Sequence, residues 1–297
     1  MVEETLREQV AVKSLGEAQV TVVGLGLMGG SLAAALRGVG QTVVGVARRE
    51  ATIDLALDRG IIDRGTTRLA DGVTEADVVV LATPVRAILH QIGEIGPLLP
   101  EGCLLMDLGS TKADIVAEMA GLPEHVQPLG GHPMCGKESS GLAATDPTIY
   151  RGATFILSPL ARTSAEALEL GRALVRAVGS EPLVLDAERQ DFLTGTLSHL
   201  PYLMACALVA VADETTSPDP AAWQIVAGGY RDTTRVAGSD VTMMTDILLT
   251  NRQEVLSALD VFQDQIKRLA RLLESGDEQR LRTVLSQIRQ KRLEMYP

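Results

Sequence analysis

The chain has 297 residues, which suits two domains or one large one rather than a single small core. With 46% hydrophobic and 22% charged residues, its composition excludes a disordered or a fibrous protein. The net charge is −11 and no basic cluster exceeds a few residues, so we expect neither a nucleic acid nor a membrane surface as a partner. An anionic ligand would then be held by individually placed arginines or by helix N-termini.

Nothing in the composition predicts export, membrane insertion or a metal site. The longest apolar run, Tyr202–Ala212, is far shorter than the about 20 residues that a membrane-spanning helix needs. The opening residues lack the basic and apolar parts of a secretory signal, and we assign residues 1–17 to an N-terminal tail. The three cysteines are widely spaced and odd in number, which argues against a disulfide framework and a structural zinc site. We therefore expect a cytoplasmic protein.

Short apolar runs alternate with helical segments in the first part of the chain. The runs that we predict as buried strands are 19–23, 42–46, 77–82, 102–108, 126–129, 153–158 and 183–186. Helical spacing lies between several of them, at 29–39, 49–60 and 164–178. This alternation predicts an α/β domain with a doubly wound parallel sheet, the Rossmann architecture, over residues 1–186.

The strand pattern stops after residue 186, and only helical spacing follows. It covers 187–214, a segment near 221–236, 242–274 and 278–295. In the third segment, apolar side chains recur at intervals of four and three, namely Val255, Leu259, Phe262, Ile266, Leu269 and Leu273. We predict an all-helical domain over 187–297. The apolar seam is either an oligomer surface or buried within one subunit, and we favour a homodimer formed through this domain.

A glycine-rich turn, Gly24-Leu-Gly26-Leu-Met28-Gly29, follows the first predicted strand directly and opens a helix. In this context the pattern predicts a site for the pyrophosphate of a dinucleotide. The first glycine permits the tight turn, the second lets the phosphates approach the backbone, and the third lets the helix pack on the strand. We expect Gly24, Gly26, Met28 and Gly29 to contact the cofactor.

The residues after the second predicted strand indicate which dinucleotide binds. An NAD enzyme usually has Asp or Glu there, whereas this chain has Arg48 and Arg49. Guanidinium groups form paired, charge-assisted hydrogen bonds with a phosphate, so these arginines and Thr52 favour NADP, with NAD possible. The alternative is an ordinary solvated helix start. Thr83 and Pro84, at the end of strand 77–82, are expected to lie near the nicotinamide.

Two of the four histidines are candidates for proton chemistry. His132, in Gly130-Gly131-His132-Pro133-Met134, is expected on a loop at the carboxyl edge of the sheet, where catalysis is a better explanation than packing. His199 lies in a predicted helix beside Pro201 and is as compatible with a core histidine as with a site residue. His90 and His125 are expected to be solvated or structural.

Two further segments carry polar groups that fit a site. In Asp107-Leu-Gly-Ser110-Thr111-Lys112, Ser110 and Thr111 either cap the next helix or line the ligand crevice, and the two roles are compatible. In Arg231-Asp-Thr233-Thr-Arg235, the two arginines lie four apart on one helical face. They either clamp a carboxylate or pair with nearby acids, and the spacing alone does not distinguish these roles.

Taken in order, five of these motifs resemble prephenate/arogenate dehydrogenases, the enzymes of tyrosine biosynthesis. The motifs are Gly24-x-Gly26-x-x-Gly29, Asp107-Leu-Gly-Ser110-Thr-Lys112, Gly131-His132-Pro133-Met134, Ser198-His199-Leu200-Pro201 and Arg231-Asp-Thr233-Thr-Arg235. The likeness runs along nearly the whole chain from Gln19.

The resemblance implies an oxidative decarboxylation with assigned residue roles. His132 would accept the proton of the ring 4-hydroxyl as a hydride leaves the same carbon for the nicotinamide. Ser110 would hydrogen-bond that hydroxyl, and Arg235 would hold the ring carboxylate that leaves as CO₂. His199, Tyr202 and Thr233 would contact the substrate.

The choice of substrate depends on one departure from the family pattern. Many prephenate-type members have a second histidine where this chain has Tyr202, near the end of the substrate at which a keto acid and an amino acid differ. The segment around Arg48 and Arg49 is similar to the NADP-using arogenate branch. We therefore favour arogenate over prephenate, with aminodeoxyprephenate as a further alternative. Because the chain ends at Pro297, we also expect no fused mutase or regulatory domain.

Two other classes of protein fit part of the pattern. The β-hydroxyacid dehydrogenases have a similar glycine fingerprint, but they place a catalytic lysine on the first helix of their helical domain. This chain has no lysine between Lys137 and Lys267. A non-catalytic module that senses NADP is the alternative from outside enzymology, and it would bind the cofactor without turnover.

Overall fold

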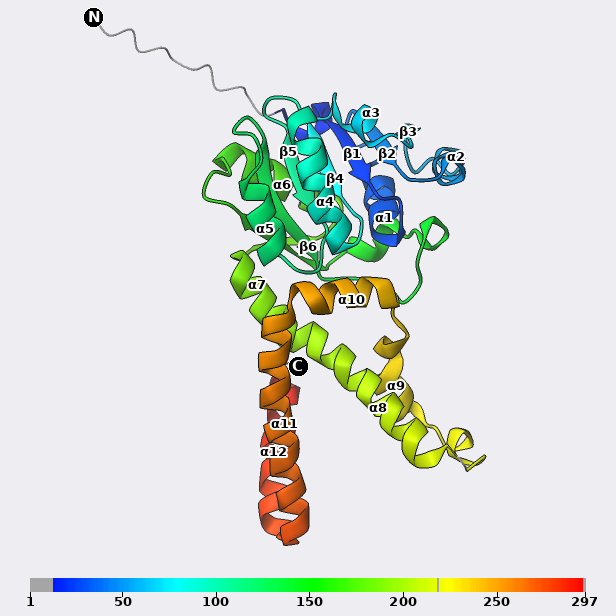
Figure 1. The fold of residues 1–297 in the computed structure, drawn as a ribbon, viewed down its shortest axis with the longest axis vertical. Helices are drawn as coiled ribbons and strands as arrows, with labels where there is room; N and C mark the ends of the chain where they lie inside the picture. Colours follow the sequence, from blue (N-terminus) through cyan, green and yellow to red (C-terminus); the bar gives the residue numbers. More distant parts are fainter. Residues whose placement is uncertain (1–12, 218, 296–297) are drawn as a thin grey trace, which may run out of the picture.

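The computed structural model describes residues 13–217 and 219–295, and most of the expected N-terminal tail lies outside these ranges. Figure 1 shows a sheet domain and a helical part that extends away from it in long arms. The assignment of residues 13–17 to a tail is wrong. Leu15–Glu17 is a 3₁₀ helix, and Leu15 is buried in the core of the sheet domain. Burial of a leucine side chain contributes about 1.5–3 kcal/mol, which attaches this segment to the domain.

Within the described residues, eight strands form one sheet in the order β3-β2-β1-β4-β5-β6-β7-β8. The strands are β1 (Gln19–Val23), β2 (Thr42–Val46), β3 (Arg64–Thr66), β4 (Val78–Leu81), β5 (Leu104–Asp107), β6 (Gln127–Pro133), β7 (Thr154–Pro159) and β8 (Glu181–Val184). Strands β1 to β6 are parallel, which confirms the doubly wound Rossmann sheet. The order reverses between β1 and β4, and ligands of such sheets bind at the carboxyl ends of the strands there.

The sheet differs from the expectation at its two edges. The short strand β3 was not predicted, because its sequence, Arg-Gly-Thr, has no apolar pattern. At the other edge β7 runs antiparallel to β6, and β8 runs parallel to β7. An antiparallel pair needs no crossover helix. The β6–β7 connection instead contains two 3₁₀ turns, η3 (Leu142–Ala144) and η4 (Pro147–Tyr150).

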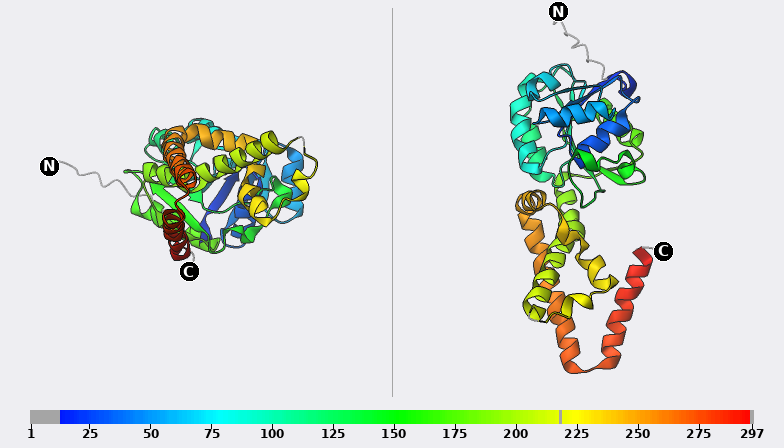
Figure 2. Two further views of the ribbon diagram at one scale, coloured as in Figure 1. Left: turned by 90° about the horizontal axis from the view of Figure 1, so that it is seen from below. Right: turned by 90° about the vertical axis from the view of Figure 1, so that its right-hand side faces the viewer.

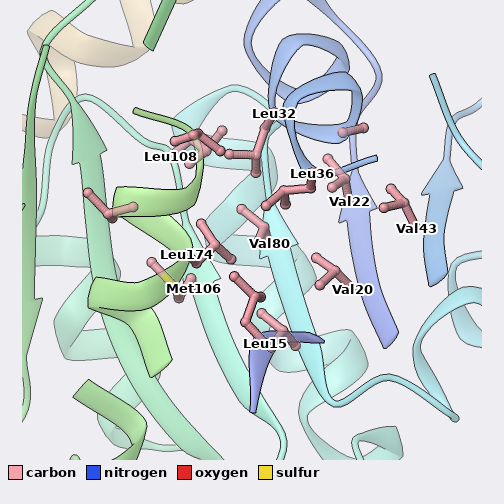
Figure 3. Close-up of a cluster of buried hydrophobic side chains, with 14 of the residues drawn as sticks. Leu15, Val20, Val22, Leu32, Leu36, Val43, Val80, Met106, Leu108 and Leu174 are labelled. Carbon is pink, nitrogen blue, oxygen red and sulfur yellow. The ribbon is translucent and has the colours of Figure 1, made fainter. Parts of the chain in front are cut away.

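Helices cover both faces of the sheet. They are α1 (Leu27–Leu36), α2 (Glu50–Asp58), α3 (Leu69–Val73), α4 (Val85–Ile95), α5 (Ala113–Ala120) and α6 (Ala165–Ala177). Alternate residues of a strand serve opposite faces. Val20 and Val22 of β1 join Leu32 of α1 in one buried cluster (Figure 3), whereas Val23 packs in a second cluster with Ile88 of α4. Burial on both sides explains why the strands are continuous apolar runs.

The helical part begins with a long helix that leaves the sheet domain. It consists of α7 (Ala187–Thr194), a π-helical turn (Gly195–His199) and α8 (Leu200–Thr216), and it is followed by α9 (Gly228–Thr234), α10 (Val241–Thr250), α11 (Arg252–Ser275) and α12 (Glu278–Met295). Helices α8 and α11 diverge, and α12 turns back toward the sheet domain (Figures 1 and 2). The prediction of one helix over 242–274 is wrong, because Asn251 has non-helical backbone angles and separates α10 from α11.

The helical part leaves much apolar surface uncovered by its own chain. In the seam on α11, Ile266 is 48% and Leu273 is 67% exposed. By length and composition, the run Ala187–Thr216 is the one helix of the described residues that resembles a membrane span, with 17% of its apolar window buried. Apolar side chains are therefore left open along both arms of the helical part.

Candidate active site

The glycine-rich turn between β1 and α1 has the geometry that a pyrophosphate site requires. Gly24 has φ of +100°, and a Cβ there would lie 2.8 Å from the carbonyl oxygen of Ala82. A Cβ on Gly29 would overlap the carbonyl oxygen of Gly24. At Gly26, by contrast, a Cβ would meet no described atom within 4 Å, and this residue directly precedes the N-terminus of α1. The space beside Gly26 is thus open to an anionic group at the positive end of a helix.

The arginine pair lies next to this turn. The N–H of Gly24 donates to the carbonyl of Val46 over 2.9 Å, which brings the end of β2 against the glycine turn. Arg48 and Arg49 follow that strand, and both are exposed. No ion pair joins either guanidinium to another described residue. Thr52 is half-buried in the first turn of α2. These side chains are free to meet a ligand.

Three other residues predicted to bind the cofactor lie at the ends of α1 and α4. The half-buried Met28 accepts a hydrogen bond at its carbonyl from the Tyr150 hydroxyl, over 2.8 Å. Thr83 follows β4, and its hydroxyl is 2.7 Å from Oε1 of Gln91. Pro84 is the residue before α4. All three border the carboxyl edge of the sheet, but the Thr83 hydroxyl already has a partner.

His132 lies within a strand, and the expectation of a loop is wrong. Strand β6 continues through Pro133 because β7 pairs with it, placing His132 opposite Ile156. The side chain is 8% exposed, and Nδ1 is buried without a hydrogen-bond partner among the described residues. Burial, together with the nearby Lys112 and His199, lowers the pKa of His132 to about 3. The imidazole is therefore neutral and held in the sheet.

A buried ion pair supports the strand next to His132. Asp107 and Lys112 are fully buried and pair with each other, and Asp107 also accepts the N–H of Gly131 over 2.9 Å. A Cβ on Gly131 would overlap the Asp107 backbone, and one on Gly130 would lie 3.0 Å from Lys112 Cδ. The two glycines thus let the strand approach the pair. Lys112 belongs to a motif that is visible in the sequence, but no role was predicted for it.

The N-terminus of α5 is capped from the helical part and not by Ser110 or Thr111, so the capping role that the sequence left open for these two residues is not observed. Oδ1 of Asp191, on α7, accepts the N–H of Lys112 over 2.7 Å, and Oδ2 accepts that of Ala113 over 2.8 Å. A carboxylate at a helix N-terminus satisfies free N–H groups and interacts favourably with the helix dipole. This cap joins the two domains directly behind the site.

Ser110 and Thr111 have other surroundings. The hydroxyls of Thr111 and Thr250 are 2.8 Å apart and add a second link between the domains. The carbonyl of Ser110 accepts a long hydrogen bond, 3.4 Å, from Nε2 of Gln190. Its half-buried hydroxyl has no hydrogen bond to a described residue, and it is therefore available to a ligand.

His199 comes from the other domain and lies close enough to His132 to affect its pKa. It ends the π-helical turn before α8, is 1% exposed, and has Nδ1 at 3.1 Å from Nδ2 of Asn251. Burial lowers its pKa to about 4. Asn251 also donates to the backbone carbonyl of Asp191 over 2.8 Å. Asn251 and Asp191 were not predicted as site residues, because their partners are distant in the chain and leave no local pattern.

The remaining predicted substrate residues lie farther along the helical part. Arg235, exposed just after α9, forms an ion pair with Glu138 in the loop that follows β6. The Thr233 hydroxyl donates to the Gly229 carbonyl of its own helix over 2.7 Å. Tyr202 is half-buried on α8 near Cys206. In the described part of the chain, none of the three hydrogen-bonds to either site histidine.

Comparison with known proteins agrees with this arrangement. The family profile described as "Prephenate dehydrogenase, nucleotide-binding domain" matches residues 32–183, and "Prephenate dehydrogenase, dimerization domain" matches residues 186–287. The prephenate dehydrogenase of Bacillus subtilis is 33% identical over 267 residues, which are 88% of this chain and 72% of that protein.

Solved structures agree as well. A prephenate dehydrogenase from A. aeolicus, in complex with hydroxyphenyl propionate and NAD+, has a TM-score of 0.88 at 33% identity, covering 95% of this chain and 100% of that one. A Synechocystis arogenate dehydrogenase has a TM-score of 0.81 at 26% identity, covering 93% and 99%. The chain therefore belongs to the prephenate/arogenate dehydrogenase family.

Proposed function

We propose that this enzyme oxidatively decarboxylates arogenate, or prephenate, with NADP+ as the oxidant. The observation that carries the proposal is the pair of buried, neutral histidines, His132 and His199, which two domains bring to one place at the carboxyl edge of the sheet. Membership of the family supports the reaction class, and the relatives include both a prephenate and an arogenate dehydrogenase.

The residues at the glycine turn fit a dinucleotide. The open space at Gly26 and the N-terminus of α1 suit the pyrophosphate, and the unpaired Arg48 and Arg49, with Thr52, suit a 2′-phosphate. Met28, Thr83 and Pro84 would border the remainder. When bound, NADP+ supplies the acceptor for the hydride that leaves C4 of the substrate ring. The A. aeolicus relative contains NAD+, so NAD is the alternative cofactor.

His132 acts as the base in this proposal. Its neutral imidazole accepts the proton of the ring 4-hydroxyl, and the free hydroxyl of Ser110 hydrogen-bonds the same oxygen. A pKa of about 3 in the free enzyme is low for a base at neutral pH, but the carboxylates of the substrate would raise it by stabilising the imidazolium. The ring carboxylate departs as CO₂ when the ring becomes aromatic.

Substrate binding falls to the helical part. Arg235 would hold the ring carboxylate, exchanging Glu138, its partner in the free chain, for the substrate. His199, Tyr202 and Thr233 would contact the rest of the molecule. Because Tyr202 stands where a second histidine favours prephenate in many relatives, we prefer arogenate.

We also propose that two copies of the chain associate through the helical part, in the cytoplasm. The matched family profile is described as a dimerization domain, and the exposed seam of α11 supplies an apolar surface for it. Association would cover the side chains that a single chain leaves open to water.

A kinetic assay tests the reaction and the cofactor together. The purified protein is incubated with arogenate or prephenate and with NADP+ or NAD+, following the ultraviolet absorbance of the reduced nicotinamide and identifying the product by mass spectrometry. We expect the highest kcat/KM with arogenate and NADP+. Cofactor binding without turnover of either substrate would instead support a sensing module.

A substitution of Arg48 tests the proposed preference for NADP+ over NAD+. Arg48→Asp should raise KM for NADP+ by about tenfold or more and shift the preference toward NAD+, because a carboxylate repels the 2′-phosphate. Arg59→Asp, an equal charge change at the exposed end of α2, is the matched control and should leave the preference unchanged. Retention of full NADP preference by Arg48→Asp would show that this contact is misplaced.

A further inference from the structure

Asn251 is a buried polar residue at the break between two helices, and its side chain contacts residues that are distant in the sequence. It separates α10 from α11, is 4% exposed, and sends its amide nitrogen toward two acceptors at once. Nδ2 lies 2.8 Å from the backbone carbonyl oxygen of Asp191 and 3.1 Å from Nδ1 of His199. The helix break is therefore the place from which this side chain reaches the site.

The contact with Asp191 determines how the amide is oriented. A backbone carbonyl oxygen can only accept a hydrogen bond, so the atom facing it must be the NH₂ group of Asn251 and not its oxygen. The same NH₂ group has a second hydrogen, which faces the His199 ring. Nδ1 of His199 must then accept that hydrogen bond, which requires Nδ1 to carry no proton.

The geometry also disfavours a charged His199. A doubly protonated ring would place an N–H of His199 against an N–H of Asn251 in a site that excludes water. Burial acts in the same direction and lowers the pKa of His199 to about 4. In the neutral ring, the single proton must then reside on Nε2. Among the described residues, none hydrogen-bonds to Nε2.

We propose that Asn251 is a positioning residue that fixes the tautomer of His199, leaving Nε2–H as a hydrogen-bond donor toward the substrate. The tautomer follows from contacts within the chain alone, whereas the role of the donor rests on the proposed function. Keeping His199 neutral also removes a positive charge beside His132, the group that has to accept a proton.

Nuclear magnetic resonance of the ring nitrogens tests the tautomer directly. The full-length protein is labelled with ¹⁵N-histidine, and His199→Gln identifies the signals of His199. At neutral pH, without substrate, we expect an unprotonated Nδ1 and a protonated Nε2. A protonated Nδ1 in the unsubstituted protein would overturn the proposal, and this measurement does not depend on turnover of any substrate.

Asn251→Asp supplies the second arm, because a carboxylate accepts hydrogen bonds and donates none. Nδ1 of His199 should become protonated, and kcat/KM should fall by about tenfold or more, as expected for one misdirected hydrogen bond. The control is Thr250→Val, which removes the neighbouring link to Thr111 between the same domains and should leave the ring signals unchanged.

The outcomes separate the tautomer from the reaction. An unprotonated Nδ1 in Asn251→Asp would contradict the role of Asn251. If that variant does not fold, the spectrum of the unsubstituted protein still decides. Absence of turnover with arogenate and prephenate would remove the proposed function and the donor role while leaving the tautomer measurement valid.

Discussion

His132 and His199 come from different domains, and both are neutral near pH 7 because water barely reaches either ring. Their immediate neighbours are an ion pair on one side and an amide on the other. Asp107 and Lys112 support the strand that carries His132, while Asn251 faces Nδ1 of His199. At this scale, the candidate site consists of two imidazoles that burial keeps neutral and that buried polar neighbours surround.

Replacing His132 tests its proposed role as base. We expect His132→Asn to lower kcat by about 10²–10⁴ with little change in KM, because only the proton transfer is removed. Steady-state kinetics with the preferred substrate would measure both parameters. His90→Asn, at an exposed position on α4, is the control and should behave like the unsubstituted enzyme. A loss confined to KM would argue for a binding role.

The two histidines also predict how stability depends on pH. Their folded-state pKa values, about 3 and about 4, lie below the unfolded value of 6.5. Between these values, the two histidines are protonated in the unfolded chain and neutral in the folded one. The free energy of unfolding should therefore fall as the pH drops below 6.5, by about 1.4 kcal/mol per pH unit for each histidine until its folded pKa is reached. Urea unfolding at several pH values would measure this slope.

The variant His132→Asn isolates the contribution of one ring from that of the carboxyl groups. Its slope against pH should be shallower than that of the unsubstituted protein over the same range. Identical slopes for the two proteins would mean that His132 becomes protonated in the folded state as readily as in the unfolded state.

At the scale of elements, the three glycines of the turn between β1 and α1 have different surroundings. Gly24 and Gly29 are required by the fold, because a side chain at either would collide with backbone. Gly26 is different, since a methyl group there meets only open space. The fold therefore explains Gly24 and Gly29, and the proposed cofactor would explain Gly26.

Gly26→Ala should therefore leave the fold intact and weaken cofactor binding. We expect the free energy of unfolding to change by no more than about 0.5 kcal/mol, while the cofactor Kd rises roughly tenfold or more because the methyl group occupies the space of the pyrophosphate. Calorimetric titration and urea unfolding would measure the two quantities. Gly29→Ala is the comparison and should lose stability as well. Unchanged affinity in Gly26→Ala would place the cofactor elsewhere.

Elements defined by local pattern were predictable, whereas those defined by a distant partner were not. The sequence predicts β1, the glycine turn and the helical character of residues after 186, because apolar period and glycine spacing are local signals. The extension of β6 to His132 depends on antiparallel pairing with β7. The end of α10 at Asn251 coincides with contacts to Asp191 and His199, which no short window contains.

The same division applies to the site. His132, His199 and Ser110 could be nominated from motifs, because glycine, proline and strand ends mark their surroundings. Lys112 stood in a quoted motif, but its burial follows from the approach of Gly130 and Asp107 in three dimensions. The roles of the nominated residues stay predictions until they are measured.

At the scale of the whole molecule, helices cover the sheet of the N-terminal domain (Figure 1). The helical arms extend away from it and leave apolar side chains exposed. The apolar seam of α11 follows helical spacing, yet Ile266 and Leu273 in it are exposed, as expected for a surface that a partner covers. The long helix Ala187–Thr216, whose composition resembles a membrane span, lies in this same part. The association of two chains proposed above would account for both observations.

The oligomeric state can be tested on α11. Light scattering should give the unsubstituted protein twice the mass of one chain, and Ile266→Glu combined with Leu273→Glu should raise the dimer dissociation constant at least about a hundredfold, because charges would enter an apolar interface. Leu98→Glu, at a similarly exposed leucine of the sheet domain, is the control. A monomeric unsubstituted protein would rule out the proposed interface.

The β6–β7 connection links the strand that carries His132 to the helix that follows the glycine turn. After His132, this connection forms hydrogen bonds with α1. The Tyr150 hydroxyl donates to the Met28 carbonyl, and the Asp146 N–H donates to Oγ of Ser31. These hydrogen bonds would hold His132 and the bound dinucleotide in one unit of the sheet domain. The distance between them would then be set before the substrate binds. A movement of the helical part relative to the sheet domain would shift the substrate. It would not change the distance between His132, the proton acceptor, and the nicotinamide, the hydride acceptor.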